Sequence, residues 1–396
     1  MPYFPAEVEV AEREKASQVE QYLARSGGRL ACPHPVHRFA QVPNSPARVI
    51  LPECAGRGPW LAARRDGVGG SEVAALVGIS EYDTSWSIFN KKVRTDPDVE
   101  LTGAPIEWGH RLEDVVAQKV AEEIGMASRF GGGLWANPEK PFLRVTPDRF
   151  ATKPRSWKAE ALIECKTAGD DEHWESGTIR PGGHGTGSAP LHYQAQCQWQ
   201  MGIIGLKKAY LGCLVMGRER SFFTVEIDFD PEWFAELARE AERFWTENVL
   251  TGEPPMHDLR HPKTEELLKL LQPKVVKPSI DLPADTEEWL ADYLKLKAAF
   301  EKAEEDLNQV KNYFRMMTGD AGAGYLPWPG KPDGLKITSY PEVGSTRIDV
   351  EALKRDFPEI AEKVTVRSSY RRLTISVPKE IKKKLATPVD TSPSTL

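Results

Sequence analysis

Charged residues interrupt the segment 143–166, which otherwise has the composition of buried strands. An apolar run ends at Asp148, a polar turn follows, and the next apolar run contains Glu164 and Lys166. Because side chains alternate across a strand, Glu164 and Lys166 share one face, whereas Ile163 points the other way into a core. We expect Asp148 to end the neighbouring strand and the two strands to pair as a hairpin. This pairing would bring two carboxylates and an ammonium to the rim of a sheet, which is the geometry of a metal site with a resident cation.

The composition indicates a large chain from a reducing compartment. Its 396 residues are enough to bury a sizeable core and to form two or three domains. The net charge of −6 indicates no basic surface overall, although a local groove can still be basic. Five cysteines without paired spacing favour free thiols. We expect a cytoplasmic protein, because no export signal or apolar run long enough to span a bilayer is found.

Changes in composition along the chain predict five parts. They are an N-terminal helix and irregular arm (1–57), a main domain (58–253), a linker (254–283), a long helix (284–318) and a small β-containing appendix with a disordered basic tail (319–396). In the long helix, apolar residues from Trp289 to Phe314 alternate four and three apart, which is typical of coiled-coil packing. Its partner could be another helix of this chain or another copy.

The arm contains four residues of the kind that bind zinc, Cys32, His34, His37 and Cys54. Their spacing is not that of the standard zinc fingers, so an ordinary loop is the favoured interpretation.

A glycine turn at the start of the main domain is a candidate phosphate site. Gly69 and Gly70 precede Ser71, which we predict to be the N-cap of a short helix. Free N–H groups at such a helix start attract phosphate, and Arg64 is close enough in sequence to add a charged contact. The alternative is an ordinary capped helix after a glycine turn.

Glu113 is a carboxylate in an unusual place. Apolar residues of the segment 105–124 recur at helical spacing, and Glu113 falls inside the apolar arc between Val120 and Ile124. Burying an unpaired carboxylate costs several kcal/mol, on the order of 3 to 5. We therefore expect Glu113 to lie near a metal or a cation, or to be wet at the rim of the arc.

A helix with four glutamines follows a polar segment. Residues 168–190 are rich in Gly, Pro, Asp and His and are predicted to form a loop or lid. In the helix that starts near Pro190, Tyr193, Gln196 and Gln200 lie on one stripe, where amides could bind a phosphate or a metal-bound water. A solvated polar face is the alternative.

Together these residues form the Asp–spacer–Glu-x-Lys pattern of a metal-dependent nuclease. Carboxylate oxygens suit Mg²⁺ or Mn²⁺, and Asp148, Glu164 and the Cys165 carbonyl could hold one or two such ions. Lys166 could orient the attacking water and offset charge on the phosphorane, and Glu113 could complete the metal site.

In their order along the chain, these motifs resemble a known family. They are Trp60 to Glu72, Glu107-Trp108-Gly109 with Glu113, Thr146-Pro147-Asp148, Glu164-Cys165-Lys166 and Tyr193 to Gln198. The segment from about Trp60 to Val249 is similar to lambda exonuclease-like alkaline nucleases, in particular the YqaJ-type viral recombinases of phages and prophages, within the PD-(D/E)XK superfamily. The resemblance implies an α/β restriction-endonuclease-like core, with a central mixed sheet flanked by helices. The long helix and the small α+β appendix also resemble those attached to phage members.

The resemblance implies roles for individual residues and an activity. Asp148, Glu164 and the Cys165 carbonyl would carry the metals, Glu113 would support them, Lys166 would serve the water, Gln196 would contact the site, Tyr193 and Gln200 would lie near DNA, and Arg64 and Ser71 would hold a 5′-phosphate. The implied enzyme is a Mg²⁺-dependent exonuclease that resects duplex DNA from the 5′ end and leaves a 3′ overhang for a single-strand annealing protein. It would act in the cytoplasm of a bacterial host, and family members can form a toroidal trimer around DNA.

Two other functions remain compatible with the sequence. One is an endonuclease, or a nuclease of opposite polarity, in DNA repair or defence, because the metal site is shared across the superfamily. The other is a catalytically silent DNA-binding or assembly protein with the same fold. The intact acidic set argues against the second, and the 5′-phosphate pair argues against the first.

Overall fold

The computed structural model describes residues 40–93, 104–216, 222–271, 279–284, 286–329, 331–338, 350–364 and 378. The chain divides into two units, Met1–Leu270 and Leu271–Leu396. The expected N-terminal helix, the zinc alternative at Cys32, His34 and His37, and the basic tail lie outside the described residues, as does the side chain of Cys54. Among the helices that the structure describes, none is long and apolar enough to cross a membrane.

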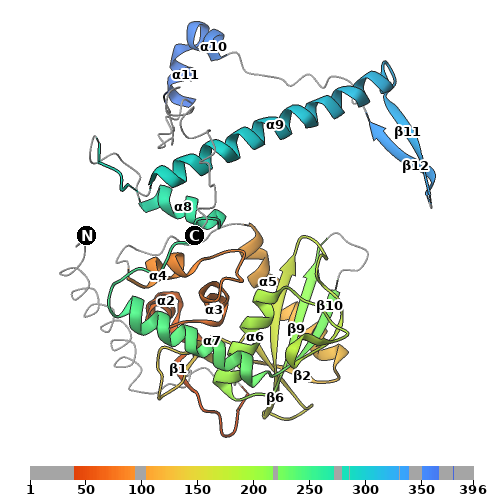
Figure 1. Ribbon diagram of the computed structural model, residues 1–396. Helices are drawn as coiled ribbons and strands as arrows, with labels where there is room; N and C mark the ends of the chain where they lie inside the picture. The colour runs from red at the N-terminus through yellow and green to blue at the C-terminus, as the bar shows by residue number, and fades with distance from the viewer. Residues whose placement is uncertain are drawn as a thin grey trace, which may run out of the picture. The chain divides into compact units, whose positions relative to one another are not determined.

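A seven-stranded mixed sheet is the centre of the first unit (Figure 1). In spatial order its strands are β2 (Ala127–Phe130), β5 (Arg149–Thr152), β6 (Ala159–Ala168), β9 (Lys208–Val215), β10 (Phe222–Asp228), β7 (Gly177–Arg180) and β8 (His184–Gly185). β5 and β6 are antiparallel, with Arg149 opposite Ile163, whereas β6 and β9 are parallel. A parallel pair requires a long crossover connection, and the one between β6 and β9 contains a helix and two further strands of the sheet. The predicted central mixed sheet is confirmed.

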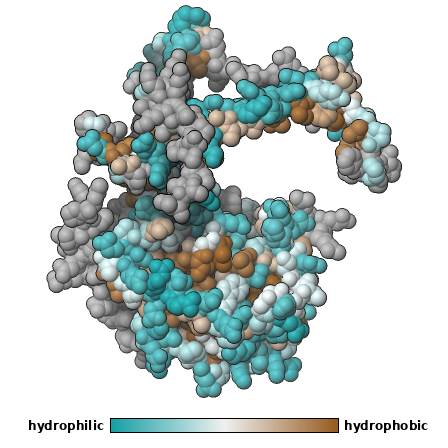
Figure 2. All heavy atoms as spheres, viewed as in Figure 1, coloured by the Kyte–Doolittle hydropathy of each residue, from teal (hydrophilic) through white to brown (hydrophobic). Residues whose placement is uncertain are grey.

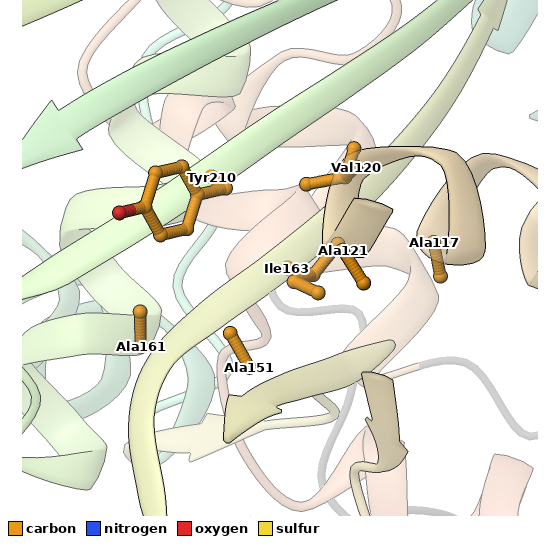
Figure 3. Close-up of a cluster of buried hydrophobic side chains, with 7 residues drawn as sticks. All are labelled: Ala117, Val120, Ala121, Ala151, Ala161, Ile163 and Tyr210. Carbon is orange, nitrogen blue, oxygen red and sulfur yellow. The ribbon is translucent and has the colours of Figure 1, made fainter. Parts of the chain in front are cut away.

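Helix α5 (Ala104–Glu123) covers one face of this sheet. Its Ala117, Val120 and Ala121 form a buried cluster with alternate residues of the strands, including Ile163 (Figure 3). Gly212 on β9 permits this close packing, because a Cβ there would lie 2.4 Å from Val120 Cγ2. The face of β6 that was expected to be apolar therefore packs against α5.

Helix α6 (Leu191–Ile204) covers the opposite face. It ends at Gly205, whose φ of 88° is the left-handed conformation that glycine adopts readily at a helix end. Trp199, fully buried, lies on this helix, and α6 packs in turn against α3 (Gly70–Leu76) and α7 (Pro231–Arg243). Helices thus lie on both faces of the sheet, as the resemblance implied.

A three-stranded sheet lies beside the main one and supports the start of the domain. Its order is β1 (Arg48–Pro52), β3 (Gly133–Ala136) and β4 (Arg144–Val145). Leu51 and Leu134 pack with Ala63 of α2 (Arg57–Arg65). The remaining elements of this region are η1 (Glu53–Ala55) and α4 (Ser85–Val93).

The segment 168–190 differs from the predicted loop. It contains β7, the turn η2 (Pro181–Gly183) and β8, and β7 pairs in parallel with β10 through Val225 opposite Gly177. β8 is the edge strand of the sheet, where one side of the backbone needs no strand partner, and β7 lies next to it, between β8 and β10.

The end of the first unit also holds more structure than the composition suggested. After α7 the helix continues as η3 (Phe244–Val249). The predicted linker 254–283 then contains α8 (Pro262–Leu271).

The second unit is built around one long helix, α9 (Thr286–Thr318). A hairpin of β11 (Ala323–Trp328) and β12 (Lys331–Thr338) follows, and then α10 (Val350–Asp356) and α11 (Pro358–Val364). The expected long helix is present, and the hairpin of β11 and β12 supplies the β-structure expected in the appendix.

Candidate active site

Asp148 lies at the start of a strand and not at the end of one. The apolar run before it forms β4 in the small sheet, and the chain then crosses to the main sheet, where β5 begins at Arg149. The prediction that Asp148 ends a strand is therefore wrong, although the pairing of the following strand with β6 is as expected. Asp148 Oδ2 accepts a hydrogen bond from the Cys165 N–H at 2.9 Å, which holds the carboxylate against β6.

Glu164 is the most enclosed carboxylate of the site. It is 1% exposed and accepts hydrogen bonds on both oxygens: Oε1 from Lys166 Nζ at 2.5 Å and Gln196 Nε2 at 2.6 Å, and Oε2 from Gln200 Nε2 at 2.8 Å. The glutamine stripe of α6 thus faces the sheet, and its alternative as a solvated surface is wrong. A charge this deep needs such donors, because an unpaired buried carboxylate is strongly unfavourable.

Lys166 is held as a cation. Burial acts to lower the pKa of its ammonium, but the Glu164 and Asp148 carboxylates outweigh burial and raise that pKa. The ammonium also lies 4.9 Å from the centre of the Tyr193 ring. Lys166 is therefore suited to donate hydrogen bonds and to stabilise negative charge, and it is unsuited to accept a proton.

The carboxylates carry more negative charge than Lys166 neutralises. Burial, and after it the charge of Glu164, raises the pKa of Asp148 well above its ordinary value, and Glu113 adds to the effect. Such a shift marks a place where a further cation would be favourable. It thus identifies the vicinity of Asp148 as electrostatically prepared for a positive ligand.

Glu113 meets a cation that the sequence did not reveal. Its Oε1 atom lies 2.5 Å from Arg149 Nη1, and burial raises the pKa of Glu113 in spite of this pair. Glu113 was predicted to lie near a metal, near a cation or in water at the rim of the arc, and the structure places it beside a cation. Arg149 directly follows Asp148, but a lone arginine after a motif carries no signal of its own, so only the packing of α5 beside β5 discloses the pair.

Arg64 and Ser71 come together across the turn between α2 and α3. Arg64 Nη2 donates to Ser71 Oγ at 2.7 Å. The prediction that Ser71 is the N-cap is wrong: Gly69 is the cap, and its N–H donates to Glu72 Oε2 at 2.9 Å. Ser71 instead occupies the first turn, with its hydroxyl turned toward the guanidinium.

Two buried residues that sequence reasoning missed hold Arg64 in place. Glu72 Oε1 lies 3.4 Å from Arg64 Nε, and Lys92 Nζ, on a side chain only 1% exposed, lies 2.7 Å from Glu72 Oε2 and 3.0 Å from the Arg64 carbonyl. Burial acts to raise the pKa of Glu72, but Lys92 and Arg64 together hold it at about 2. The spacing of Gly69 and Glu72 is that of a capping box and could have indicated Glu72. Lys92 had no local signal.

One open cavity of about 730 Å³ joins these groups. It is lined by the carboxylate cluster and Lys166, by the two α6 glutamines, and by the residues around the glycine turn, including Trp60, Arg64, Gly69, Gly70 and Ser71. The structure therefore places the predicted metal residues and the predicted phosphate residues around the same space.

The donor set fits a hard divalent cation. Asp148 and Glu164 supply carboxylate oxygens, the Cys165 backbone supplies a carbonyl, and Mg²⁺ and Mn²⁺ prefer oxygen ligands of this kind. Within the described residues, no three His, Cys, Asp or Glu side chains lie close enough to one another to hold a metal by themselves. A metal here would thus rest on two carboxylates, with backbone and water completing the set, which is usual for Mg²⁺.

Residues 59–207 match a family model described as the YqaJ-like viral recombinase domain. This segment contains every motif on which the resemblance rested. Residues 59–207 are thus similar to the YqaJ-like viral recombinase domain.

Outside that domain the likeness to a relative extends further along the chain. The uncharacterized protein YqaJ of Bacillus subtilis (strain 168) is 28% identical over 323 residues, which is 81% of this chain and 94% of the relative.

Two solved structures are also similar to this chain. The alkaline exonuclease LHK-Exo from Laribacter hongkongensis aligns with a TM-score of 0.36 and 16% identity over 54% of this chain and 98% of its own. A phage-related exonuclease from Haemophilus somnus 129PT aligns with a TM-score of 0.34 and 13% identity over 47% of this chain and 96% of its own.

Proposed function

We propose that this chain is a Mg²⁺-dependent exonuclease that degrades one strand of duplex DNA from its 5′ end and leaves a 3′ single-stranded overhang. One observation carries the proposal: the carboxylates with Lys166 and the Arg64–Ser71 pair line the same cavity. A phosphodiester held at the carboxylates and a terminal phosphate held at Arg64 can then belong to one strand. The YqaJ-like viral recombinase domain supports a role in phage-type recombination.

Asp148, Glu164 and the Cys165 carbonyl would hold the metal ion. When bound, the metal ion would polarise the scissile phosphate and lower the pKa of the attacking water. Lys166 remains protonated beside Glu164, so its ammonium would orient the water by donating a hydrogen bond and would stabilise the charge that develops on the phosphorane oxygens.

Gln196 and Gln200 would keep Glu164 in a fixed orientation through their hydrogen bonds to its two oxygens. Glu113 of α5 would add negative charge to the site, and its ion pair with Arg149 would fix the orientation of its carboxylate. Tyr193 would line the path of the DNA next to Lys166.

Arg64 and Ser71 would bind the 5′-phosphate. A guanidinium can contact phosphate through two parallel hydrogen bonds, and the Ser71 hydroxyl, which now accepts from Arg64, is free to donate one. Because Glu72 and Lys92 fix the guanidinium before any ligand arrives, little side-chain entropy would be lost on binding.

The decisive experiment is a time course with Mg²⁺ on linear duplexes labelled at either end. We expect mononucleotides from the 5′-labelled strand first, faster digestion of 5′-phosphorylated than of 5′-hydroxyl ends, and no cutting of closed circular DNA. Equal digestion rates for 5′-phosphorylated and 5′-hydroxyl ends, or cleavage of closed circular DNA, would favour an endonuclease. DNA binding without digestion in either Mg²⁺ or Mn²⁺ would favour the silent binding protein.

The proposal includes a partner protein and an oligomeric state. A 3′ overhang is the substrate of a single-strand annealing protein, so such a protein is the expected partner in the cell. A toroidal trimer around DNA would make the resection processive, and it follows from the resemblance alone.

A further inference from the structure

Helix α9 carries a continuous apolar stripe along almost its full length. Its members recur at alternating intervals of four and three, and they are Trp289, Tyr293, Leu296, Phe300, Ala303, Leu307, Val310 and Phe314. This is the a and d pattern of a coiled coil, in which each side chain enters a hole on a facing helix. At 33 residues the helix is about 50 Å long, enough for four successive heptads of such packing.

The stripe has no cover within the described part of the chain. The structure has no buried residue on α9, and Trp289, Leu296 and Phe300 are 64%, 68% and 70% exposed. Figure 2 shows apolar side chains following one side of this helix. An exposed apolar surface of this regularity marks a site of association, because each side chain left in water costs the free energy that its burial would contribute.

The charged residues beside the stripe of one α9 helix complement those of a second α9 helix. If two copies of α9 lie parallel and in register, Asp292 of one faces Lys297 of the other, and Asp306 faces Lys311. If they lie antiparallel with the stripes superimposed, Lys297 faces Glu304. Both alignments bring opposite charges together at the seam, which is how flanking positions select a partner in coiled coils.

We propose that α9 is a self-association helix, which forms a coiled coil with α9 of a second copy of this chain. The apolar stripe supplies the contact, and the flanking charges favour a copy of the same sequence over an unrelated helix. The nuclease domain would then be presented in more than one copy per assembly, whatever its substrate.

Crosslinking of the full chain tests this proposal and also reads the direction of the helices. In a parallel pair, the cysteine of Val310→Cys lies beside the same cysteine of the second chain. In an antiparallel pair, position 310 of one chain lies beside position 293 of the other, so this arm mixes Val310→Cys chains with Tyr293→Cys chains. We expect a dimer band under mild oxidation in one of these two arms. The parent chain controls for its natural cysteines, and Glu305→Cys, on the outer side of α9, controls for random collision.

Two substitutions to aspartate test whether the crosslink depends on the apolar stripe or on the helix as a whole. Adding Phe300→Asp to the crosslinking chain should abolish the dimer band, because it places a charge in the seam, whereas Ala298→Asp on the outer side should leave the band unchanged. No band above the controls in either arm would overturn the proposal, as would a band that persists with Phe300→Asp.

Discussion

The guanidinium of Arg64 donates a hydrogen bond to Ser71 Oγ at 2.7 Å across the turn between α2 and α3. The same guanidinium lies 3.4 Å from the buried carboxylate of Glu72. These two neighbours therefore fix the orientation of the guanidinium at the edge of the cavity. The proposed 5′-phosphate site would therefore be preformed before any ligand binds.

Arg64→Ala should remove the preference for a 5′-phosphate. A charge-assisted hydrogen bond contributes about 1.5 to 3 kcal/mol, so we expect digestion of 5′-phosphorylated duplex to slow by about 10- to 100-fold, and that of 5′-hydroxyl duplex much less. The measurement is the initial rate on both substrates. Arg239→Ala, an exposed arginine on α7, is the matched control. An unchanged ratio of the two rates in Arg64→Ala would remove Arg64 from the phosphate site.

Asp148→Asn should abolish digestion and leave the fold at least as stable. The amide keeps an oxygen for the Cys165 N–H but loses the charge that would bind the metal, so we expect a rate loss of at least about 100-fold. Because burial and Glu164 raise the pKa of Asp148, its ionised form is less favourable in the folded than in the unfolded chain, and the melting temperature without metal should stay equal or rise.

Lys166→Ala is the companion variant and Glu122→Gln, an exposed carboxylate on α5, is the control. Lys166→Ala should also lose digestion, since it removes the ammonium beside Glu164 that would orient the attacking water. Digestion at the parent rate in either Asp148→Asn or Lys166→Ala would contradict the assignment of the active site.

Two glutamines of α6 should behave differently when each is changed to alanine. Gln200 donates to Glu164, whereas Gln198 donates to the Asp228 carbonyl and accepts from the Asp230 N–H. Gln200→Ala should lower the rate and raise the Mg²⁺ concentration needed for half-maximal digestion. Gln198→Ala should cost about 2 kcal/mol of unfolding free energy with the Mg²⁺ dependence unchanged. Mg²⁺ titrations and thermal unfolding of both variants make the comparison, and identical Mg²⁺ curves would argue against the role of Gln200.

The buried Glu72 should make stability depend on acid pH. Its folded pKa of about 2 lies below its ordinary value of 4.5, so its contribution is complete above pH 4.5 and is lost as the pH falls toward 2. The shift corresponds to about 3 kcal/mol of unfolding free energy. Urea unfolding between pH 6 and 3 should show a shallower acid loss in Glu72→Gln than in the parent chain. The exposed Glu160→Gln should match the parent, and equal slopes for Glu72→Gln and the parent would contradict this role of Glu72.

The sequence alone was enough wherever the information was local or periodic. Alternation along residues 160–166 put Glu164 and Lys166 on one face, and helical spacing put Gln196 and Gln200 on one stripe. Heptad spacing likewise predicted α9. Each of these depends only on the repeat of a strand or a helix, which neighbouring residues determine.

What the tertiary structure decided depends on residues far apart in the chain. Asp148 immediately precedes β5, because the run before it pairs with β3 in another sheet, and strand pairing is set by partners that sequence proximity does not reveal. Glu113 meets Arg149 only because α5 packs beside β5, and Lys92 reaches Glu72 only because α4 lies against α3. A buried charge acquires its partner when the chain folds, so the charges of this site were visible in the sequence, whereas their pairing was determined by the packing.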